Sequence, residues 1–184
     1  MLYRITFVLI FCVCGFCGYA QELQPPQFYL SRADVSRDAK DYYTEGLNTE
    51  DLNKTNLHKA YSVLDSVFTD NDVTRPFYIL MACHMLSQAE GELLEELKII
   101  SRFTAELQPG SLGQVLFSRE KAYSGYKTQW AKAMASEIRI SCTSDLMACF
   151  RKSRSEALQH CNESDKMHLE TLYNMVRKDL NLFQ

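Results

Sequence analysis

Glycine and proline are scarce in this chain, with seven glycines and four prolines among 184 residues. The sequence therefore lacks the Gly- and Pro-rich tracts that are typical of flexible linkers. After residue 20, no segment alternates apolar and polar residues with β-branched enrichment, which is the pattern of a half-buried strand. A faint tetratricopeptide-like spacing over residues 39–64 does not recur near residues 94–98. These absences predict one all-α domain.

An excess of basic residues is missing as well. Without residues 1–20, whose only charged side chain is Arg4, 19 Lys and Arg stand against 23 Asp and Glu, which gives a formal charge of −4. A protein that neutralises phosphates needs a basic face, so we predict no nucleic-acid partner. The short cluster of Arg151, Lys152 and Arg154 could bind an anion, but such clusters are more typical of the solvated side of a helix.

Motifs of common catalytic sites are absent after residue 20. The sequence there contains no G-x-S-x-G, H-E-x-x-H, glycine-rich phosphate loop or C-x-x-C-H. Cys83 and His84 are adjacent, but neighbours on a helix point about 100° apart and cannot pair as nucleophile and base. We interpret His84 as a buried histidine with a hydrogen-bond partner. We therefore predict a protein that is not an enzyme, with no catalytic residue and no cofactor.

The first 20 residues have the organisation of a signal peptide. Arg4 provides a positive charge, residues 5–16 form a short apolar core, and Ala20 ends a small-x-small cleavage pattern. A membrane span would need about 20 consecutive apolar residues, more than this run contains. We predict cleavage between Ala20 and Gln21. The protein is then exported to the periplasm or the cell exterior, without a stable membrane anchor.

The rest of the chain consists of segments with helical periodicity. Apolar residues recur at three- and four-residue spacing, which predicts helices that bury one face. These segments cover residues 57–68, 76–86, 93–107, 112–138, 146–161 and 169–183, and Leu107 is the last inward position of the third. Residues 77–86 are apolar at every position except His84, so we expect this helix in the middle of the domain. Short connections favour a single-domain bundle of about five to seven helices, with a short α-solenoid of helical repeats as the alternative. The predicted layout is a cleaved signal peptide over 1–20, an extended N-terminal arm over 21–33 and a helical domain over 34–184.

Several residues mark the expected ends of these helices. Thr74 precedes one apolar periodic segment, and Thr143, Ser144 and Asp145 form a turn before another; their side chains are of the types that cap helix N-termini. Gly91 is expected to break or kink the helix after residue 86, because glycine is unfavourable in a helix interior. Pro109 is expected to end a helix, and Ser111 is expected to cap the long segment that follows.

The long segment carries aromatic side chains on its apolar stripe. The residues of this stripe are Leu112, Leu116, Tyr123, Tyr126, Trp130, Met134 and Ile138. Tyrosine and tryptophan at helical spacing are usually core residues whose polar atoms find a partner near the surface. We therefore predict core packing, with a ligand platform of Tyr123, Tyr126 and Trp130 as the alternative.

Four cysteines remain after the predicted cleavage: Cys83, Cys142, Cys149 and Cys161. In an exported protein an even number favours disulfides. Cys149 and Cys161 would lie about 18 Å apart on one helix, too far for a bridge. Cys142 and Cys149 flank a turn and could approach each other, whereas Cys161 would pair with Cys83 or have no partner. We predict at most one or two bridges.

A set of potential zinc ligands lies in the same region. It comprises Cys142, Cys149, His160, Cys161 and His168. Structural zinc sites usually bring ligands in pairs two to four residues apart, which this spacing does not match, so we predict no metal site. Four carboxylates, placed where negative charge stabilises the start of a helix, need no hydrolytic role: Glu90, Glu92, Glu95 and Glu96.

These observations together favour an exported, non-enzymatic helical protein that binds another protein through a helical face. An inhibitor or immunity-type protein of the cell envelope is one concrete form of this hypothesis. The competing hypothesis is a small-ligand or metal-binding helical domain that uses the aromatic stripe or the cysteine and histidine set. An enzyme with an unrecognised site is a third.

Overall fold

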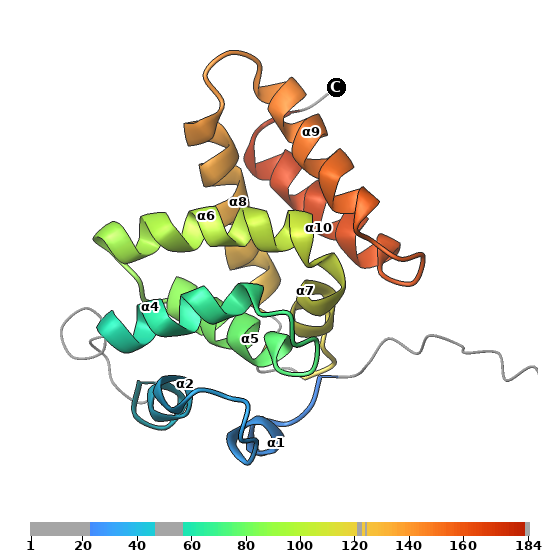
Figure 1. Cartoon of the computed structure of the whole chain (residues 1–184). Helices are drawn as coiled ribbons and strands as arrows, with labels where there is room; N and C mark the ends of the chain where they lie inside the picture. Colours follow the sequence, from blue (N-terminus) through green and yellow to red (C-terminus); the bar gives the residue numbers. More distant parts are fainter. Residues whose placement is uncertain (1–22, 47–56, 121–122, 124, 183–184) are drawn as a thin grey trace, which may run out of the picture.

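The computed structural model describes residues 23–46, 57–120, 123 and 125–182. Within these residues the chain is all-helical and has no strand, which confirms the predicted fold class (Figure 1). The elements are α1 (Pro26–Leu30), α2 (Arg37–Asp41), the π-helical turn η1 (Tyr42–Gly46), α4 (Leu57–Asp65), the 3-10 turn η2 (Ser66–Phe68), α5 (Arg75–Leu86), α6 (Gly91–Leu107), α7 (Pro109–Leu116), α8 (Tyr126–Ser141), α9 (Leu146–Gln159) and α10 (Lys166–Asp179).

The helices pack into one body, which α6 crosses at mid-height (Figure 1). Helix α8 packs against α5, α6, α9 and α10, and α6 also packs against α9. In a solenoid, each repeat contacts only its neighbours along the chain. The contacts of α5 with α8 and of α6 with α9 join helices that are not neighbours, so the architecture is a single helical body.

Helix α5 lies in the interior of this body. All residues from Arg75 to Cys83 are buried, and so is Met85, whereas His84 is only partly buried. From Pro76 to Leu86 the segment is apolar except for His84, so burial on every side is the arrangement that its composition favours. The prediction of a central helix is confirmed.

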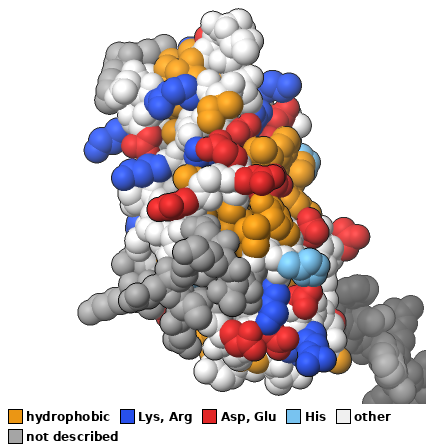
Figure 2. Space-filling view, turned by 90° about the vertical axis from the view of Figure 1, so that its left-hand side faces the viewer, with side chains coloured by type: hydrophobic (Ala, Val, Ile, Leu, Met, Phe, Trp, Pro, Cys, Tyr) orange, Lys and Arg blue, Asp and Glu red, His pale blue; other side chains and the backbone are white. Residues whose placement is uncertain are grey.

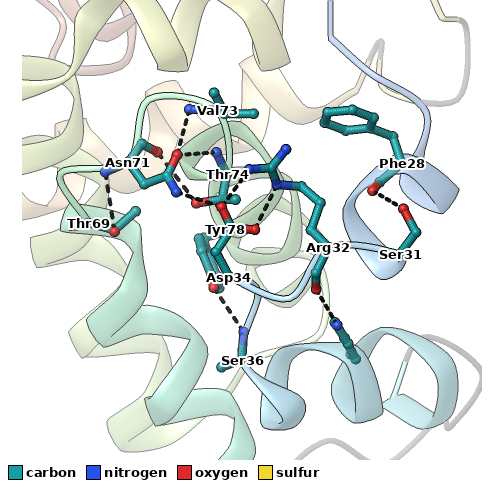
Figure 3. A network of polar contacts seen from close by, with 11 residues as sticks. Phe28, Ser31, Arg32, Asp34, Ser36, Thr69, Asn71, Val73, Thr74 and Tyr78 are labelled. Atoms are coloured by element: carbon teal, nitrogen blue, oxygen red, sulfur yellow. Dashed lines mark hydrogen bonds and ion pairs between the residues drawn. The ribbon is translucent and has the colours of Figure 1, made fainter.

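The turn before α5 is fixed by Asn71 rather than by Thr74. Thr74 occupies the N-cap position of α5, as predicted, but its side chain makes no cap hydrogen bond. Asn71 Oδ1 accepts hydrogen bonds from the backbone N–H groups of Val73 and Thr74 at 3.1 and 3.3 Å (Figure 3). This is the local bonding by which an asparagine side chain stabilises a turn. The buried Arg75 donates to the Thr69 carbonyl from Nε and Nη2 at 2.9 and 2.6 Å.

The predicted extended arm contains a helical turn. Residues Pro26–Leu30 form α1, with Pro26 in the first turn, where a missing N–H costs nothing. Tyr29 is buried and stacks on Phe77 of α5, with ring centroids 4.9 Å apart. The extended conformation is wrong for these residues because the turn buries Tyr29. Residues 1–22, which include the predicted cleavage site, lie outside the described residues.

A polar network joins the segment after α1 to the turn before α5 (Figure 3). Arg32 Nε donates to Asp34 Oδ1 at 2.7 Å, and Asn71 Nδ2 donates to Asp34 Oδ2 at 2.9 Å. The hydrogen bond from Arg32 lowers the pKa of Asp34 to about 2. The Ser36 N–H donates to the Tyr78 hydroxyl of α5 at 3.3 Å. The N-terminal segment is therefore anchored on the helical body.

A helix ends directly before Pro109, as predicted, but Pro109 also opens the next one. Helix α6 ends at Leu107, and Pro109 occupies the first turn of α7. The missing N–H and the fixed φ of proline suit a first turn as well as they suit a break. Ser111 lies inside α7, where its hydroxyl accepts from Nη1 of the buried Arg75 at 3.3 Å. The predicted cap at Ser111 is therefore wrong.

The long helix predicted over 112–138 is divided into α7 and α8. Helix α7 ends at Leu116 and α8 begins at Tyr126. The positions three and four residues after Leu116 are Arg119 and Glu120, so the apolar stripe has a gap there. Without an apolar face to bury, a helix loses most of its stabilisation.

The last two helices largely follow their sequence pattern. Asp145 caps α9 by accepting from the Ala148 N–H at 3.0 Å, which confirms the cap predicted within residues 143–145. Phe150 and Ala157 are buried, and Ser153 between them shares a hydrogen bond of 2.9 Å with the Tyr173 hydroxyl. On α10, the predicted inward positions that the structure describes are all buried: Leu169, Leu172, Tyr173, Val176 and Leu180. Residue 183, the last predicted position, lies outside the described residues.

Candidate functional site

Trp130 is a core residue and not part of a ligand platform. Its side chain has an exposed fraction of 0%, and its Nε1 donates to the Ser101 carbonyl of α6 at 3.0 Å. Met134 and Ile138, one and two turns later on α8, are also completely buried. The core-packing interpretation is confirmed for these three residues.

Tyr123 and Tyr126, the other two aromatic residues of the stripe, have a different environment. Their rings stack with centroids 5.8 Å apart. They line a cavity of about 70 Å³ together with residues of η1 and α5, which we call the tyrosine cavity. Its lining consists of Tyr43, Leu80, Met81, His84, Tyr123 and Tyr126. The alternative of a ligand site is therefore retained for the two tyrosines but not for Trp130.

Burial and one carboxylate shift the pKa values of residues that line the tyrosine cavity. Burial, followed by the negative charge of Glu120, raises the pKa of Tyr123 to about 12. The same two causes raise the pKa of Tyr43. Burial lowers the pKa of His84, whose Nε2 lies 3.3 Å from Nε2 of Gln88. At neutral pH the cavity thus has uncharged walls with a carboxylate nearby.

The predicted cysteine and histidine set is not brought together. Cys142 and Cys149 form a disulfide across the turn, with Cα atoms 6.2 Å apart. His160 Nδ1 lies 3.1 Å from the Glu156 carbonyl, and the ring of His168 stacks on Phe117 with centroids 4.4 Å apart. In the part of the chain that the structure describes, no three His, Cys, Asp or Glu side chains could hold one metal ion.

The two free cysteines differ in their surroundings. Cys83 is buried in α5, and burial raises the pKa of its thiol well above the ordinary value. Cys161, after α9, is partly exposed, and burial raises its pKa as well. A thiol with a raised pKa is a poor nucleophile at neutral pH.

His84 lies within hydrogen-bonding distance of Gln88, as expected for a histidine with a partner.

The basic cluster of α9 is divided between two environments. Arg151 and Arg154 line a cleft of about 230 Å³ between α9 and α10, together with Arg177. Arg154 pairs there with Glu170 of α10 through hydrogen bonds of 3.1 and 2.5 Å. Lys152 is exposed and lies outside this lining. The carboxylate of Glu170 neutralises part of the positive charge that the sequence suggested.

Helix α6 carries a feature that sequence reasoning missed. Ile99, Phe103 and Leu107 are exposed, with fractions of 37%, 42% and 47%, and follow one another at four-residue spacing on one face. We call these three residues the α6 stripe. Leu107 was predicted to face inward, which is wrong. Ile99 and Phe103 each lie one residue before the buried Ile100 and Thr104, so their offset from the inward pattern is the signal that could have revealed them.

The start of the same face of α6 is acidic. Glu92 and Glu95 are exposed and precede Ile99 by seven and four residues. Lys98 donates a hydrogen bond to Glu95 at 2.6 Å. The pKa of Tyr61 on α4 is raised mainly by burial and further by the negative charges of Glu92 and Glu96. As predicted, these carboxylates lie in the first turns of the helix, where negative charge is favourable.

Figure 2 shows the end of the molecule at which α4 and α6 begin. Hydrophobic side chains gather there into one patch, with acidic side chains along its border. None of the helices in the described ranges is long and apolar enough to cross a membrane.

Comparison with known proteins gives no relative from which a function could be transferred. No protein-family model matches the chain, and no curated protein and no solved structure shows significant similarity to it. A function proposed for this chain must therefore be argued from its own residues.

Proposed function

We propose that this chain is an exported, non-enzymatic protein that binds another protein through the α6 stripe and the acidic first turns of α6. An inhibitor or immunity-type protein of the periplasm or cell exterior would act in this way. The observation that supports the proposal best is the exposure of Ile99, Phe103 and Leu107 along one helix face. A partner that covers such a row of apolar residues removes their surface from water, which stabilises the complex.

The charges beside the stripe define the chemistry of the partner. Glu92 and Glu96 make no ion pair with another described residue, so this end of the face is negative. A suitable partner is an amphipathic helix with apolar residues at three- or four-residue spacing and with Lys or Arg opposite these two carboxylates. Apolar contacts would supply affinity, and the charges would set orientation and the rate of association.

Export is supported by the signal-like residues 1–20 and by the disulfide. The Cys142–Cys149 bridge fits an oxidising compartment, in which structural disulfides persist. Mass analysis of the secreted or periplasmic protein tests this part of the proposal. A mature N-terminus at Gln21 is expected, and retention of residues 1–20 would contradict it.

Affinity purification with paired variants tests the binding face. The mature chain is used as bait in an extract of its own compartment, and retained proteins are quantified for wild type and for Phe103→Asp. Phe103→Asp places a charge in the middle of the stripe and should abolish retention of the true partner. It should leave the fold intact, because Phe103 is 42% exposed and lies outside the buried core.

Met167→Asp is the matched control, because Met167 is exposed on α10 and lies outside the α6 stripe. It should retain the partner as wild type does. Glu92→Lys should weaken retention, and more so at low ionic strength. Equal retention by wild type, Phe103→Asp and Met167→Asp would show that the partner binds elsewhere.

A further inference from the structure

We propose that the tyrosine cavity binds a small organic cation of the methylated-ammonium class. Three tyrosines line this cavity: Tyr43 from η1 and, from a part of the chain distant in sequence, Tyr123 of the α7–α8 connection and Tyr126 at the start of α8. The site is independent of the α6 stripe, so the proposal does not depend on the proposed function.

The lining of the tyrosine cavity suits a dehydrated cation. The face of a tyrosine ring attracts cations through its quadrupole, and aromatic cages of this kind are the usual recognition of quaternary ammonium groups. Leu80 and Met81 complete the apolar lining. A methylated ammonium has no N–H groups that need acceptors, so it can enter a cavity with few hydrogen-bonding atoms.

The charges near the cavity favour a cation over an anion. Glu120 is close enough to raise the pKa of both Tyr43 and Tyr123, and no arginine or lysine of the described residues has an opposing effect on these two groups. His84 contributes no positive charge at neutral pH, because burial lowers its pKa. The cavity therefore combines three tyrosine rings with a nearby carboxylate.

The size of the cavity limits the ligand to a small head group. Its volume is about 70 Å³, which is room for about five water-sized groups. A nitrogen with its methyl groups is of this size, whereas a larger aromatic cation is not. The longer part of a larger ligand would have to extend into solvent.

Calorimetric titration of the mature chain, with its disulfide intact, tests this proposal. The probes are tetramethylammonium, choline and the uncharged alcohol in which carbon replaces the nitrogen of choline. Choline should bind at least about tenfold more tightly than its uncharged analogue, because only the cation gains from the rings. Equal affinity for the two would show that the cavity selects shape alone and would overturn the proposal.

Substitutions locate the binding. Tyr123→Leu keeps an apolar wall but removes a ring face, and it should weaken choline binding at least about fivefold. Tyr61→Leu is the matched control, a partly buried tyrosine on α4 outside the cavity, and should bind choline as wild type does. Glu120→Gln, an exposed substitution, should weaken binding without affecting the fold. Absence of choline binding to the wild type, or equal effects of Tyr123→Leu and Tyr61→Leu, would refute the site.

Discussion

Replacing Trp130 by alanine tests how the helical body is held together. The indole is fully buried on α8, and its Nε1 donates to the Ser101 carbonyl of α6 at 3.0 Å. Truncating a buried Trp to Ala typically costs about 3 to 5 kcal/mol through lost burial and the remaining cavity. The lost hydrogen bond contributes about 1 kcal/mol within such a total, so we expect a decrease of about 4 to 5 kcal/mol in the free energy of unfolding.

Urea unfolding followed by far-ultraviolet circular dichroism measures this loss. Fluorescence is unsuitable, because Trp130 is the only tryptophan of the chain. A domain of ordinary stability has about 5 to 15 kcal/mol in total, so the loss is a large fraction of the stability, and at the lower end of this range it brings the variant close to its unfolding midpoint without denaturant. Trp130→Phe keeps most of the ring, loses the N–H donor and should cost about 1 to 2 kcal/mol.

Phe103→Ala is the matched control for an aromatic side chain outside the core. Phe103 is 42% exposed on α6, so its truncation should change stability by no more than about 0.5 kcal/mol. If Trp130→Ala unfolds within about 1 kcal/mol of wild type at an unchanged urea dependence, the indole does not hold α8 on α6, and the packing described for the core is incorrect.

Three further predictions follow from the cysteines and from a buried tyrosine. Replacing both Cys142 and Cys149 by serine opens a bridge of sequence separation 7 and should lower the free energy of unfolding by about 2.4 kcal/mol, as measured by urea unfolding; an unchanged value would indicate that the bridge does not constrain the unfolded chain. In the native protein at neutral pH, an alkylating reagent should modify the partly exposed Cys161 much faster than the buried Cys83, a difference that mass spectrometry detects and that denaturation should abolish. Burial raises the pKa of Tyr173 above its ordinary value of 10.0, so the stability from its neutral phenol is complete below pH 10 and is lost as the pH rises through the pKa of the folded state; Tyr173→Phe should therefore make stability less sensitive to alkaline pH, and an identical pH profile would contradict this.

Most of the fold could be predicted from periodicity because most helices bury one clear face. The regular stripe of α10 is one example, since it has only one good arrangement, whereas residues 76–86 of α5, apolar except for His84, favour burial on every side. The division between α7 and α8 was missed because Tyr123 and Tyr126 keep helical spacing with Trp130 across a connection that is not one continuous helix. Spacing alone does not report the polar gap at Arg119 and Glu120.

The candidate sites were less predictable than the fold. The approach of Tyr43 to Tyr123 and Tyr126 depends on how η1 packs near α5 and α8, which no local pattern contains. The α6 stripe was obscured because Ile99 and Phe103 are apolar like the core positions beside them, so that only their phase on the helix distinguishes them. The pairing of Cys142 with Cys149 was among the alternatives because the two residues flank one turn.

Site-specific photo-crosslinking tests the central claim, binding through α6, most directly. A photo-reactive phenylalanine analogue is placed at position 103 or, in the control, at position 167, and the chain is irradiated in its native compartment. The proposed function predicts one defined crosslinked protein from position 103, carrying a basic amphipathic helix at the attachment site, and none from position 167. Crosslinking to that protein from position 167 alone, or no crosslink from position 103, would contradict it.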